Sequence, residues 1–407
     1  MKKTNKLTLL TLYLLLFTHF PLKATSPLQL FIDLTPEGGT LKPIPGTYSG
    51  PIVIKKSIIL DGQNEVVIDG NGTGSLLVIE ADHVTVRRCK LIHSGHSHDK
   101  VDAGITIKSD GNLVEENMIE EVLFGIHISQ GNNNVVRNNR IRGWTDDKTL
   151  KGEGLRLWNG QNNTLEGNDI RDVRDCFFSN SIHNRIIGNR ILNSRMGMEF
   201  IYSPDNEIAG NYFSNNDHGL VGIYSDNLWI HHNRIEHQRN LHGSALAIKG
   251  SSQVRLEDNI IMDCAVGLTA NAPTFPENIL YIENNQFLYN DVALYFYGDK
   301  GGHVIHGNRF TGNFQQVAVT GPTSARFNDW KGNYWQNYRG FDSDGDGYGD
   351  TPYSVYWYSE RIWMERSMAR FFRGTLALGF IDFTERLIPY SKPVLIFEDP
   401  TPGVLRQ

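Results

Sequence analysis

An eight-residue phrase with two asparagines recurs through most of this chain, and it constrains the fold more than any other feature. In outline the phrase reads Asn-x-Ile-x-x-Asn-x-Ile, as in NTLEGNDI from Asn163 and NRIIGNRI from Asn184. Its second Asn position, called the slot, is occupied in turn by Cys89, Asn117, Asn139, Asn168, Asn189, Asn211, Asn233, Asn259, Asn285, Asn308 and Asn333. Most steps between slots span 21–26 residues and two are near 28. A short period of alternating residues punctuated by turns predicts a solenoid of β-strands.

One coil per roughly 22 residues, built from short β runs, indicates a parallel β-helix. Coils stack about 4.8 Å apart, and right-handed winding is the rule for parallel crossovers. The slot asparagines then form an internal ladder, because each amide can hydrogen-bond the amide one coil away or the turn backbone. The predicted fold class is an all-β, right-handed parallel β-helix over residues 26–340 with an Asn ladder. A short helical or irregular C-terminal segment follows it.

A further strand follows a small residue in many coils, as in Gly154-Leu-Arg-Leu and Gly197-Met-Glu-Phe. Its alternation predicts that Arg156 and Glu199 lie outside the solenoid. The residues predicted to lie inside are Ile126, Leu155, Phe177, Met198, Leu220 and Leu268. The two long steps carry residues 93–104 and 144–154, which we expect to form projecting loops.

The two ends of the chain differ from the repeat. Residues 1–25 read as a signal peptide, with a positive start and an apolar run from Leu7 to Phe17 that is shorter than an ordinary membrane span. An exported protein is therefore expected. Residues 341–407 contain an Asp/Gly loop, a predicted amphipathic helix at 354–372 and a proline-rich tail. This part is expected to cap the solenoid or to dock on a partner.

The net charge and the cysteine content argue against several classes of protein. The formal net charge of −6 gives no electrostatic case for binding nucleic acid or anionic membrane. There are only three cysteines, Cys89, Cys176 and Cys264. Three is a small and odd number, which argues against a disulfide framework. They are either buried small apolar residues or soft metal ligands.

Two groups of residues have the spacing of metal ligands. The stretch FDSDGDGYGD places Asp342, Asp344 and Asp346 at positions 1, 3 and 5 of a calcium-loop pattern, and Asp350 follows. Position 12 would be Tyr353, which cannot supply the usual bidentate carboxylate, so a solvated turn is the alternative to a structural calcium site. Three histidines, His93, His96 and His98, lie on the first long loop and have a spacing that could hold copper or zinc, but surface polarity is the favoured explanation for them.

Aligning adjacent coils indicates a copper site. Asp175-Cys176-Phe177 aligns with Met196-Gly197-Met198 and with His218-Gly219-Leu220. Met196 and His218 are then neighbours on adjacent coils. Thioether and imidazole groups suit Cu(I), so Met196, Met198 and His218 are the candidate ligands. The alternative is that Met198 packs in the core and the other two are ordinary corner residues.

Longer phrases carry a resemblance to a known family. GNYWQNYRGFDSDGDGYGDTPY (332–353), SRMGMEFIYSPDNEIAGN (194–211) and GTYSGPIVIKKSIILDG (46–62) resemble the NosD family of periplasmic accessory proteins of nitrous oxide reductase maturation, a part of denitrification. The resemblance covers roughly residues 30–400. It implies a periplasmic subunit of an ABC-transporter complex at the inner membrane, which assists assembly of the copper–sulfide cluster by transient Cu(I) handling. The implied partners are the membrane and ATPase subunits of the transporter, a lipid-anchored copper chaperone and nitrous oxide reductase. The chain lacks the phosphate-binding loop of the ATPase itself.

Two other functions fit the same fold. Parallel β-helices also serve as secreted polysaccharide lyases, epimerases and glycoside hydrolases, and the hydrolases use paired carboxylates. The repeat shows no distinctive acid/base constellation, so a non-catalytic protein is the favoured interpretation. An adhesin-like structural solenoid is the remaining alternative.

Overall fold

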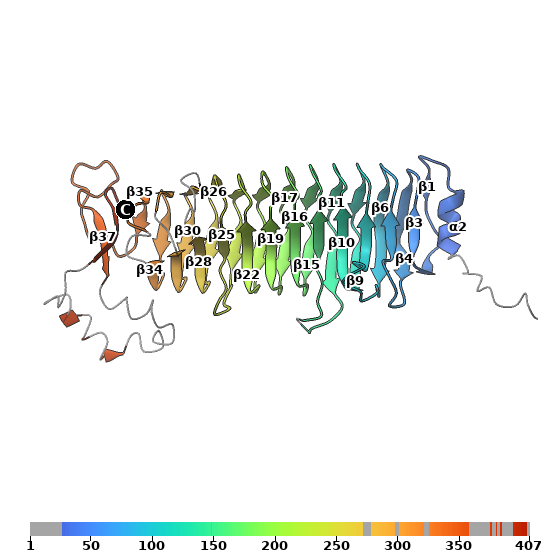
Figure 1. Ribbon diagram of the computed structural model, residues 1–407, viewed down its shortest axis with the longest axis horizontal. Helices are drawn as coiled ribbons and strands as arrows, with labels where there is room; N and C mark the ends of the chain where they lie inside the picture. Colours follow the sequence, from blue (N-terminus) through green and yellow to red (C-terminus); the bar gives the residue numbers. More distant parts are fainter. Residues whose placement is uncertain are drawn as a thin grey trace, which may run out of the picture.

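The structure is a computed structural model in which the chain forms a long rod of stacked coils (Figure 1). It describes residues 27–147, 149–271, 278–297, 301–320, 325–357 and 394–404, together with Thr375, Leu376, Phe380, Phe383 and Thr384. The expected signal peptide therefore lies outside the described residues. Within the described part, no helix is long and apolar enough to cross a membrane.

Each coil contributes one short strand to each of three faces, and every pairing between coils is parallel. Faces 1 and 2 belong to one 24-stranded sheet and share two long strands, β4 (Ile59–Asp69) and β6 (Thr85–Ile92). Face 1 also contains β1 (Thr40–Leu41), β8 (Leu113–Glu115), β11 (Val135–Arg137), β14 (Thr164–Glu166), β17 (Arg185–Ile187), β20 (Glu207–Ala209), β23 (Trp229–His231), β26 (Val254–Glu257), β29 (Leu280–Glu283), β32 (Val304–His306) and β35 (Asp329–Lys331).

Face 2 also contains β2 (Gly46–Ser49), β9 (Met118–Val122), β12 (Arg140–Gly143), β15 (Asp169–Arg171), β18 (Arg190–Leu192), β21 (Tyr212–Ser214), β24 (Arg234–Glu236), β27 (Ile260–Met262), β30 (Gln286–Leu288), β33 (Arg309–Thr311) and β36 (Tyr334–Trp335). Face 3 is a separate sheet of 12 strands. These are β3 (Ile52–Ile54), β5 (Leu77–Ile79), β7 (Ala103–Ile107), β10 (Phe124–Ser129), β13 (Leu155–Trp158), β16 (Asp175–Ser179), β19 (Met196–Ile201), β22 (His218–Ile223), β25 (Leu246–Lys249), β28 (Val266–Asn271), β31 (Val292–Tyr297) and β34 (Gln315–Val319). The predicted parallel β-helix is confirmed.

The slot asparagines form the predicted ladder where face 1 bends into face 2. In each step the side-chain Nδ2 of one Asn donates to Oδ1 of the Asn one coil further on, at 2.9–3.1 Å from Asn117 through to Asn333. The same Oδ1 accepts the backbone N–H of the preceding slot residue, as Asn139 does for Asn117. Because every amide is paired, the buried polar column carries no desolvation penalty for unpaired groups.

Both ends of the rod are covered. At the start, helix α2 (Pro27–Leu34) buries Leu28 and Ile32 against the first coils. The Gln29 side-chain amide accepts the backbone N–H of Val53 at 2.8 Å and donates to the Val53 carbonyl at 3.0 Å, so it pairs with the exposed edge of β3. The sequence interpretation missed this helix.

At the other end, β37 (Tyr353–Trp357) pairs antiparallel with β38 (Val394–Asp399). The buried Asp399 carboxylate closes the ladder, because its Oδ2 accepts the backbone N–H and Nδ2 of Asn333 and Nε1 of Trp335, at 3.0–3.2 Å. Residues 354–357, predicted to begin an amphipathic helix, are thus part of a strand, and that prediction is wrong for them. Residues 358–372 of the predicted helix lie outside the described part of the chain.

One predicted core position is also wrong. Phe177 lies on the outer side of face 3 and pairs in register with Arg156 and Glu199, whereas Cys176 and Phe178 are fully buried. The pairing of β16 with β19 is irregular, because Asp175 is opposite Met196 but Phe177 is opposite Glu199. This extra residue in β19 is a local bulge, which a residue-by-residue alignment of coils cannot register.

Candidate functional site

Met196 and His218 open neighbouring strands of face 3 and are register partners, as the coil alignment predicts. Both side chains are half-buried at the edge of the face. Met198 is in register with Leu220 and is fully buried in the core. The structure therefore brings two of the three predicted copper ligands together at the surface and places the third inside the solenoid.

The His218 ring is neutral and held in one tautomer. Burial lowers its pKa, an effect that the Asp217 carboxylate opposes and the Arg195 guanidinium reinforces. Its Nδ1 accepts the backbone N–H of Ser244 at 3.2 Å, so the neutral ring carries its proton on Nε2. A metal ion at Nε2 would require the proton to move to Nδ1, which breaks this hydrogen bond.

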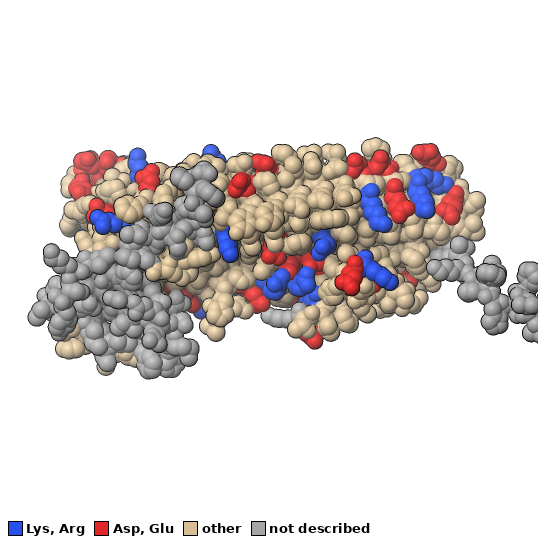
Figure 2. Space-filling view, in the orientation of Figure 1, with Lys and Arg blue, Asp and Glu red and all other residues tan. Residues whose placement is uncertain are grey.

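Beside this pair lies a charge-compensated cluster of three acidic and three basic side chains on face 3. Asp175 is buried and accepts Nε of Arg195 at 3.0 Å, Nε of Arg174 at 3.2 Å and the backbone N–H of Met196 at 3.0 Å. Arg174 also pairs with the buried Glu153. Figure 2 shows acidic and basic side chains gathered at the middle of the rod. The Asp175 contact fixes the backbone from which the Met196 side chain extends.

The remaining members of the cluster are Arg156 and Glu199. The Arg156 guanidinium lies over the Phe177 ring at 5.3 Å and 3.4 Å from Glu153. Burial, and then the Asp175 charge, raise the pKa of Glu199. A general acid or base must reach its substrate. Within this cluster Asp175 and Glu153 are buried and ion-paired with arginine side chains. Their arrangement therefore fits a structural ion-pair network better than a sugar-cleaving pair.

The three loop histidines have separate contacts, although His93 and His96 line the same hollow with Glu121 and Trp144. His93 lies between two carboxylates, with Nδ1 3.0 Å from Asp69 and Nε2 3.1 Å from Glu121. The Asp69 hydrogen bond raises the pKa of His93. His96 lies against Trp144 of the second long loop, with ring centroids 4.0 Å apart, and His98 lies edge-on to Phe124. The two long loops thus pack on each other, and each histidine has a different partner.

The acidic loop is compact and pre-shaped. Ligand oxygens of Asp342, Asp344 and Asp346 lie within 4.8 Å of one another. Asp342 accepts the backbone N–H groups of Gly345 at 2.7 Å and Gly347 at 3.0 Å. The fourth predicted ligand, Asp350, is turned toward the backbone N–H of Ser343 at 2.9 Å and lies outside this group.

The three cysteines are buried inside the solenoid and unpaired. Burial raises the pKa of each thiol to about 12. All three side chains are buried in the core, so these residues act as small core side chains. Cys89 stands in the first slot, where its backbone N–H donates to Oδ1 of Asn117 at 3.0 Å.

Sequence reasoning missed how the buried carboxylates are compensated. Asp175 and Arg195 stand on neighbouring coils, 20 residues apart, and the chain shows no pattern that singles them out as a pair. Asp399 meets Asn333 across 66 residues. The only signal for that contact is the acidic pair Glu398 and Asp399 at the end of an apolar C-terminal strand, VLIFED.

Comparison with known proteins supports the family resemblance. Residues 137–340 match the family described as periplasmic copper-binding protein (NosD), and residues 50–184 match the right-handed β-helix region. A probable ABC transporter binding protein NosD of Pseudomonas aeruginosa is 26% identical over 359 residues, covering 84% of this chain and 83% of that protein. Its counterpart from Stutzerimonas stutzeri is 25% identical, covering 89% of this chain and 86% of that protein.

Solved structures share the fold alone. The A-module of mannuronan C-5 epimerase AlgE6 of Azotobacter vinelandii has a TM-score of 0.55 at 17% identity, covering 74% of this chain and 93% of that one. A family 28 exopolygalacturonase of Yersinia enterocolitica has a TM-score of 0.56 at 11% identity, covering 76% and 75%. Fold likeness at this identity assigns no activity. By its sequence match across half its length, its β-helix and its Asn ladder, the chain belongs to the NosD family of periplasmic copper-binding proteins.

Proposed function

We propose that this protein is the periplasmic subunit of an ABC-transporter complex that assists assembly of the copper–sulfide cluster of nitrous oxide reductase. In this proposal Cu(I) is held transiently at the edge of face 3 by Met196 and His218. The observation that carries the copper step is the juxtaposition of a thioether and a neutral imidazole on adjacent strands. Two relatives named as probable ABC transporter binding proteins match this chain over most of their length. This match supports the proposed place in the transporter complex.

The ligand chemistry suits transfer rather than storage. Thioether and imidazole are ligands that Cu(I) prefers, and two protein ligands leave the ion open to a donor from a partner. Around His218 the Asp217 carboxylate favours a bound cation and the Arg195 guanidinium opposes one. Binding at Nε2 costs the Ser244 hydrogen bond. A weakly held ion can be passed on.

Met198 could contribute only by leaving the core. It is fully buried in register with Leu220, and removing a buried Met side chain from a core costs about 2–5 kcal/mol. Met196 and His218 are therefore the primary copper ligands in the proposal. Met198 is the buried member of the three predicted ligands, and a substitution there serves as the control for substitutions of Met196 and His218.

The proposed partners follow from the same role. They are a lipid-anchored copper chaperone that delivers Cu(I), nitrous oxide reductase that receives it, and the membrane and ATPase subunits of the transporter. The protein would then work in the periplasm at the inner membrane. Residues 358–393 lie between the two strands of the C-terminal cap in sequence, and we propose them as the segment that docks on the transporter.

The test uses the reductase as the readout. The gene is deleted in its own host, nitrous oxide reductase is purified, and copper and sulfide per enzyme are measured. We expect an enzyme that lacks its catalytic cluster but keeps its other copper. Complementation with Met196→Ala or His218→Ala should leave the cluster missing, whereas Met198→Leu, which conserves core volume, should restore it.

The outcomes separate the two parts of the proposal. A fully loaded reductase from the deletion strain would contradict the assembly role, and a screen of polysaccharides would then test the enzyme alternative. A loaded reductase from both the Met196→Ala and His218→Ala strains would be consistent with the assembly role. It would contradict the assignment of Met196 and His218 as copper ligands. Comparable amounts of each variant in the periplasm serve as the control for folding.

A further inference from the structure

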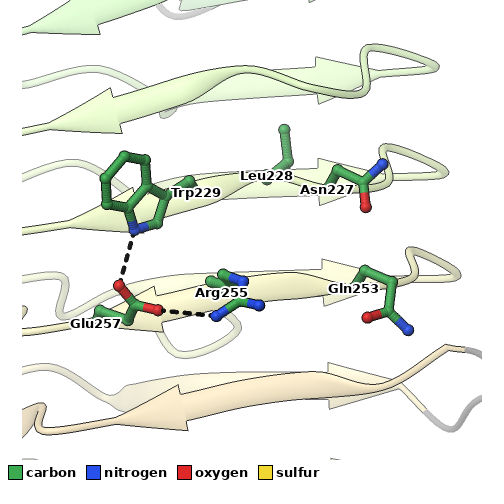
Figure 3. Close-up of a pocket in the computed structure, with 6 residues that line it drawn as sticks. All are labelled: Asn227, Leu228, Trp229, Gln253, Arg255 and Glu257. Carbon is green, nitrogen blue, oxygen red and sulfur yellow. Dashed lines mark hydrogen bonds and ion pairs between the residues drawn. The ribbon is translucent and has the colours of Figure 1, made fainter.

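A hollow lies on the outer side of face 1, between β23 and β26, on a different face from Met196 and His218. Its volume is about 470 Å³, and it is lined by Asn227, Leu228, Trp229, Gln253, Arg255 and Glu257. Figure 3 shows Trp229 and Glu257 at one end, the two amide side chains at the turn end and Arg255 between them. The volume lies within the range of about 300–1,000 Å³ typical of small-ligand sites.

The indole of Trp229 is held rigidly although it is exposed. Its ring stacks on His231 with centroids 4.0 Å apart and an interplanar angle of 23°. Its Nε1 donates to Oε2 of Glu257 at 2.9 Å. Even so, 43% of the residue remains exposed. An exposed aromatic surface fixed by two contacts is ready to stack on a ligand with little further loss of entropy.

The charges of the hollow cancel. Arg255 and Glu257 form an ion pair at 3.5 Å, and the Arg255 guanidinium also lies over the Tyr281 ring at 5.1 Å. The other polar lining groups, Asn227 and Gln253, are uncharged amides. A phosphate or a uronate would need an excess of positive charge, so these groups suit an uncharged polar ligand.

We propose that this hollow binds an uncharged N-acetylhexosamine chain. A pyranose ring offers an apolar face of C–H groups, which the indole of Trp229 can cover, and a rim of hydroxyl groups for Glu257 and Arg255. Asn227 Nδ2 donates to Asp205 at 3.0 Å and Gln253 Oε1 accepts the Tyr281 hydroxyl at 3.2 Å, so both amides are held in place. An acetamido N–H can donate to Oδ1 of Asn227. This binding is separate from copper handling.

A second aromatic surface lies at the turns that lead into face 1. Tyr202 and Tyr224 follow β19 and β22, stack with centroids 5.4 Å apart and are 56% and 50% exposed. Tyr224 is separated from Trp229 only by the turn that contains Asn227. A chain of several sugar units could therefore continue from the hollow onto these rings.

A protein side chain is the competing occupant. Four of the six lining residues carry amides or charges. An apolar anchor would desolvate the Arg255–Glu257 pair without replacing its contacts with water, which is costly. Protein hot spots are instead centred on well-packed, desolvated pockets. The polar lining therefore favours the sugar.

The test is calorimetric titration of the purified protein with the tetramer of N-acetylglucosamine. We expect binding by the wild type and a loss of at least about tenfold in affinity for Trp229→Ala, as for a central aromatic contact. Trp158→Ala is the matched control, because Trp158 is 41% exposed on β13 of face 3. It should bind like the wild type. Thermal unfolding curves show whether each variant is folded, and Gln253→Ala offers a second, smaller change in the same hollow.

Four results would overturn the proposal. They are no binding by the wild type, unchanged binding by both Trp229→Ala and Gln253→Ala, equal weakening by Trp158→Ala, and tighter binding of a polyuronate than of the neutral tetramer. Co-purification of a periplasmic protein that Trp229→Ala abolishes, with no binding of the sugar, would assign the hollow to a protein partner instead. None of these results depends on the copper content of the reductase.

Discussion

Replacing Asp399 by Leu should release the C-terminal cap from the solenoid. The Asp399 carboxylate is buried and accepts three N–H groups through Oδ2, two from Asn333 and one from Trp335. Each buried donor left without an acceptor costs about 1–3 kcal/mol. Since the groups are neighbours, their costs are not additive, and we expect a loss of about 3 kcal/mol, the low end of the sum for three donors.

Because each coil of a solenoid contacts only its neighbours, the loss should stay local. Hydrogen exchange followed by mass spectrometry measures it at the amides that join the cap to the last coil. Gly332 N–H donates to Thr401 and Gly403 N–H donates to Asn333, both at 2.9 Å. A loss of about 3 kcal/mol corresponds to roughly 150-fold faster exchange at these amides. Peptides from the central coils should exchange as in the wild type.

Asp399→Asn is the matched control, because Asn keeps one oxygen acceptor in nearly the same place. It loses the charge of the acceptor, and we expect a smaller effect of about 1 kcal/mol. Wild-type exchange at Gly332 and Gly403 in the Asp399→Leu variant would refute the reasoning. So would exchange that rises equally along the whole rod, because the ladder would then unfold as one unit.

Two further predictions concern the C-terminal part of the chain. Replacing residues 358–393 by an Asn-Gly turn should keep the cap folded, because Trp357 and Val394 are already paired. We expect that the membrane subunit of the transporter no longer co-purifies with this variant. Normal co-purification would contradict the docking proposal. Calcium at about 100 times its dissociation constant should stabilise the acidic loop by about 2.7 kcal/mol, seen as a higher melting temperature that a chelator reverses. Asp344→Asn should lose this rise and Asp350→Asn should keep most of it, because Asp350 faces Ser343. Identical melting with and without calcium would contradict a calcium site.

The sequence predicted the fold because its strongest signals are local and repeated. A slot Asn in almost every coil, with apolar residues three positions before it and two positions after it, specifies strand, bend and stacking together. The same period placed Met196 beside His218 correctly, since the coils are in register there. Where the period slips by one residue, between Asp175 and Phe177, the same reasoning put Phe177 inside although it lies outside.

Other features depend on contacts that no period encodes. Arg195, which pairs with Asp175, comes from an adjacent coil, and the orientation of His96 depends on the packing of the two long loops against each other. The hollow beside Trp229 exists because Glu257 and His231 hold the indole in place. Each of these depends on side-chain geometry that the repeat does not specify.

The sequence by itself therefore determined the solenoid, its ladder and the family, because a repeated phrase specifies the same local structure many times over. The tertiary structure alone decided where the repeat is interrupted and what ends the rod. Phe177 lies outside beside a bulge, and Asp399 closes a ladder whose last Asn lies 66 residues earlier. These outcomes depend on one bulge and one long-range contact, and the free energy of such contacts is set by burial and pairing in the folded chain.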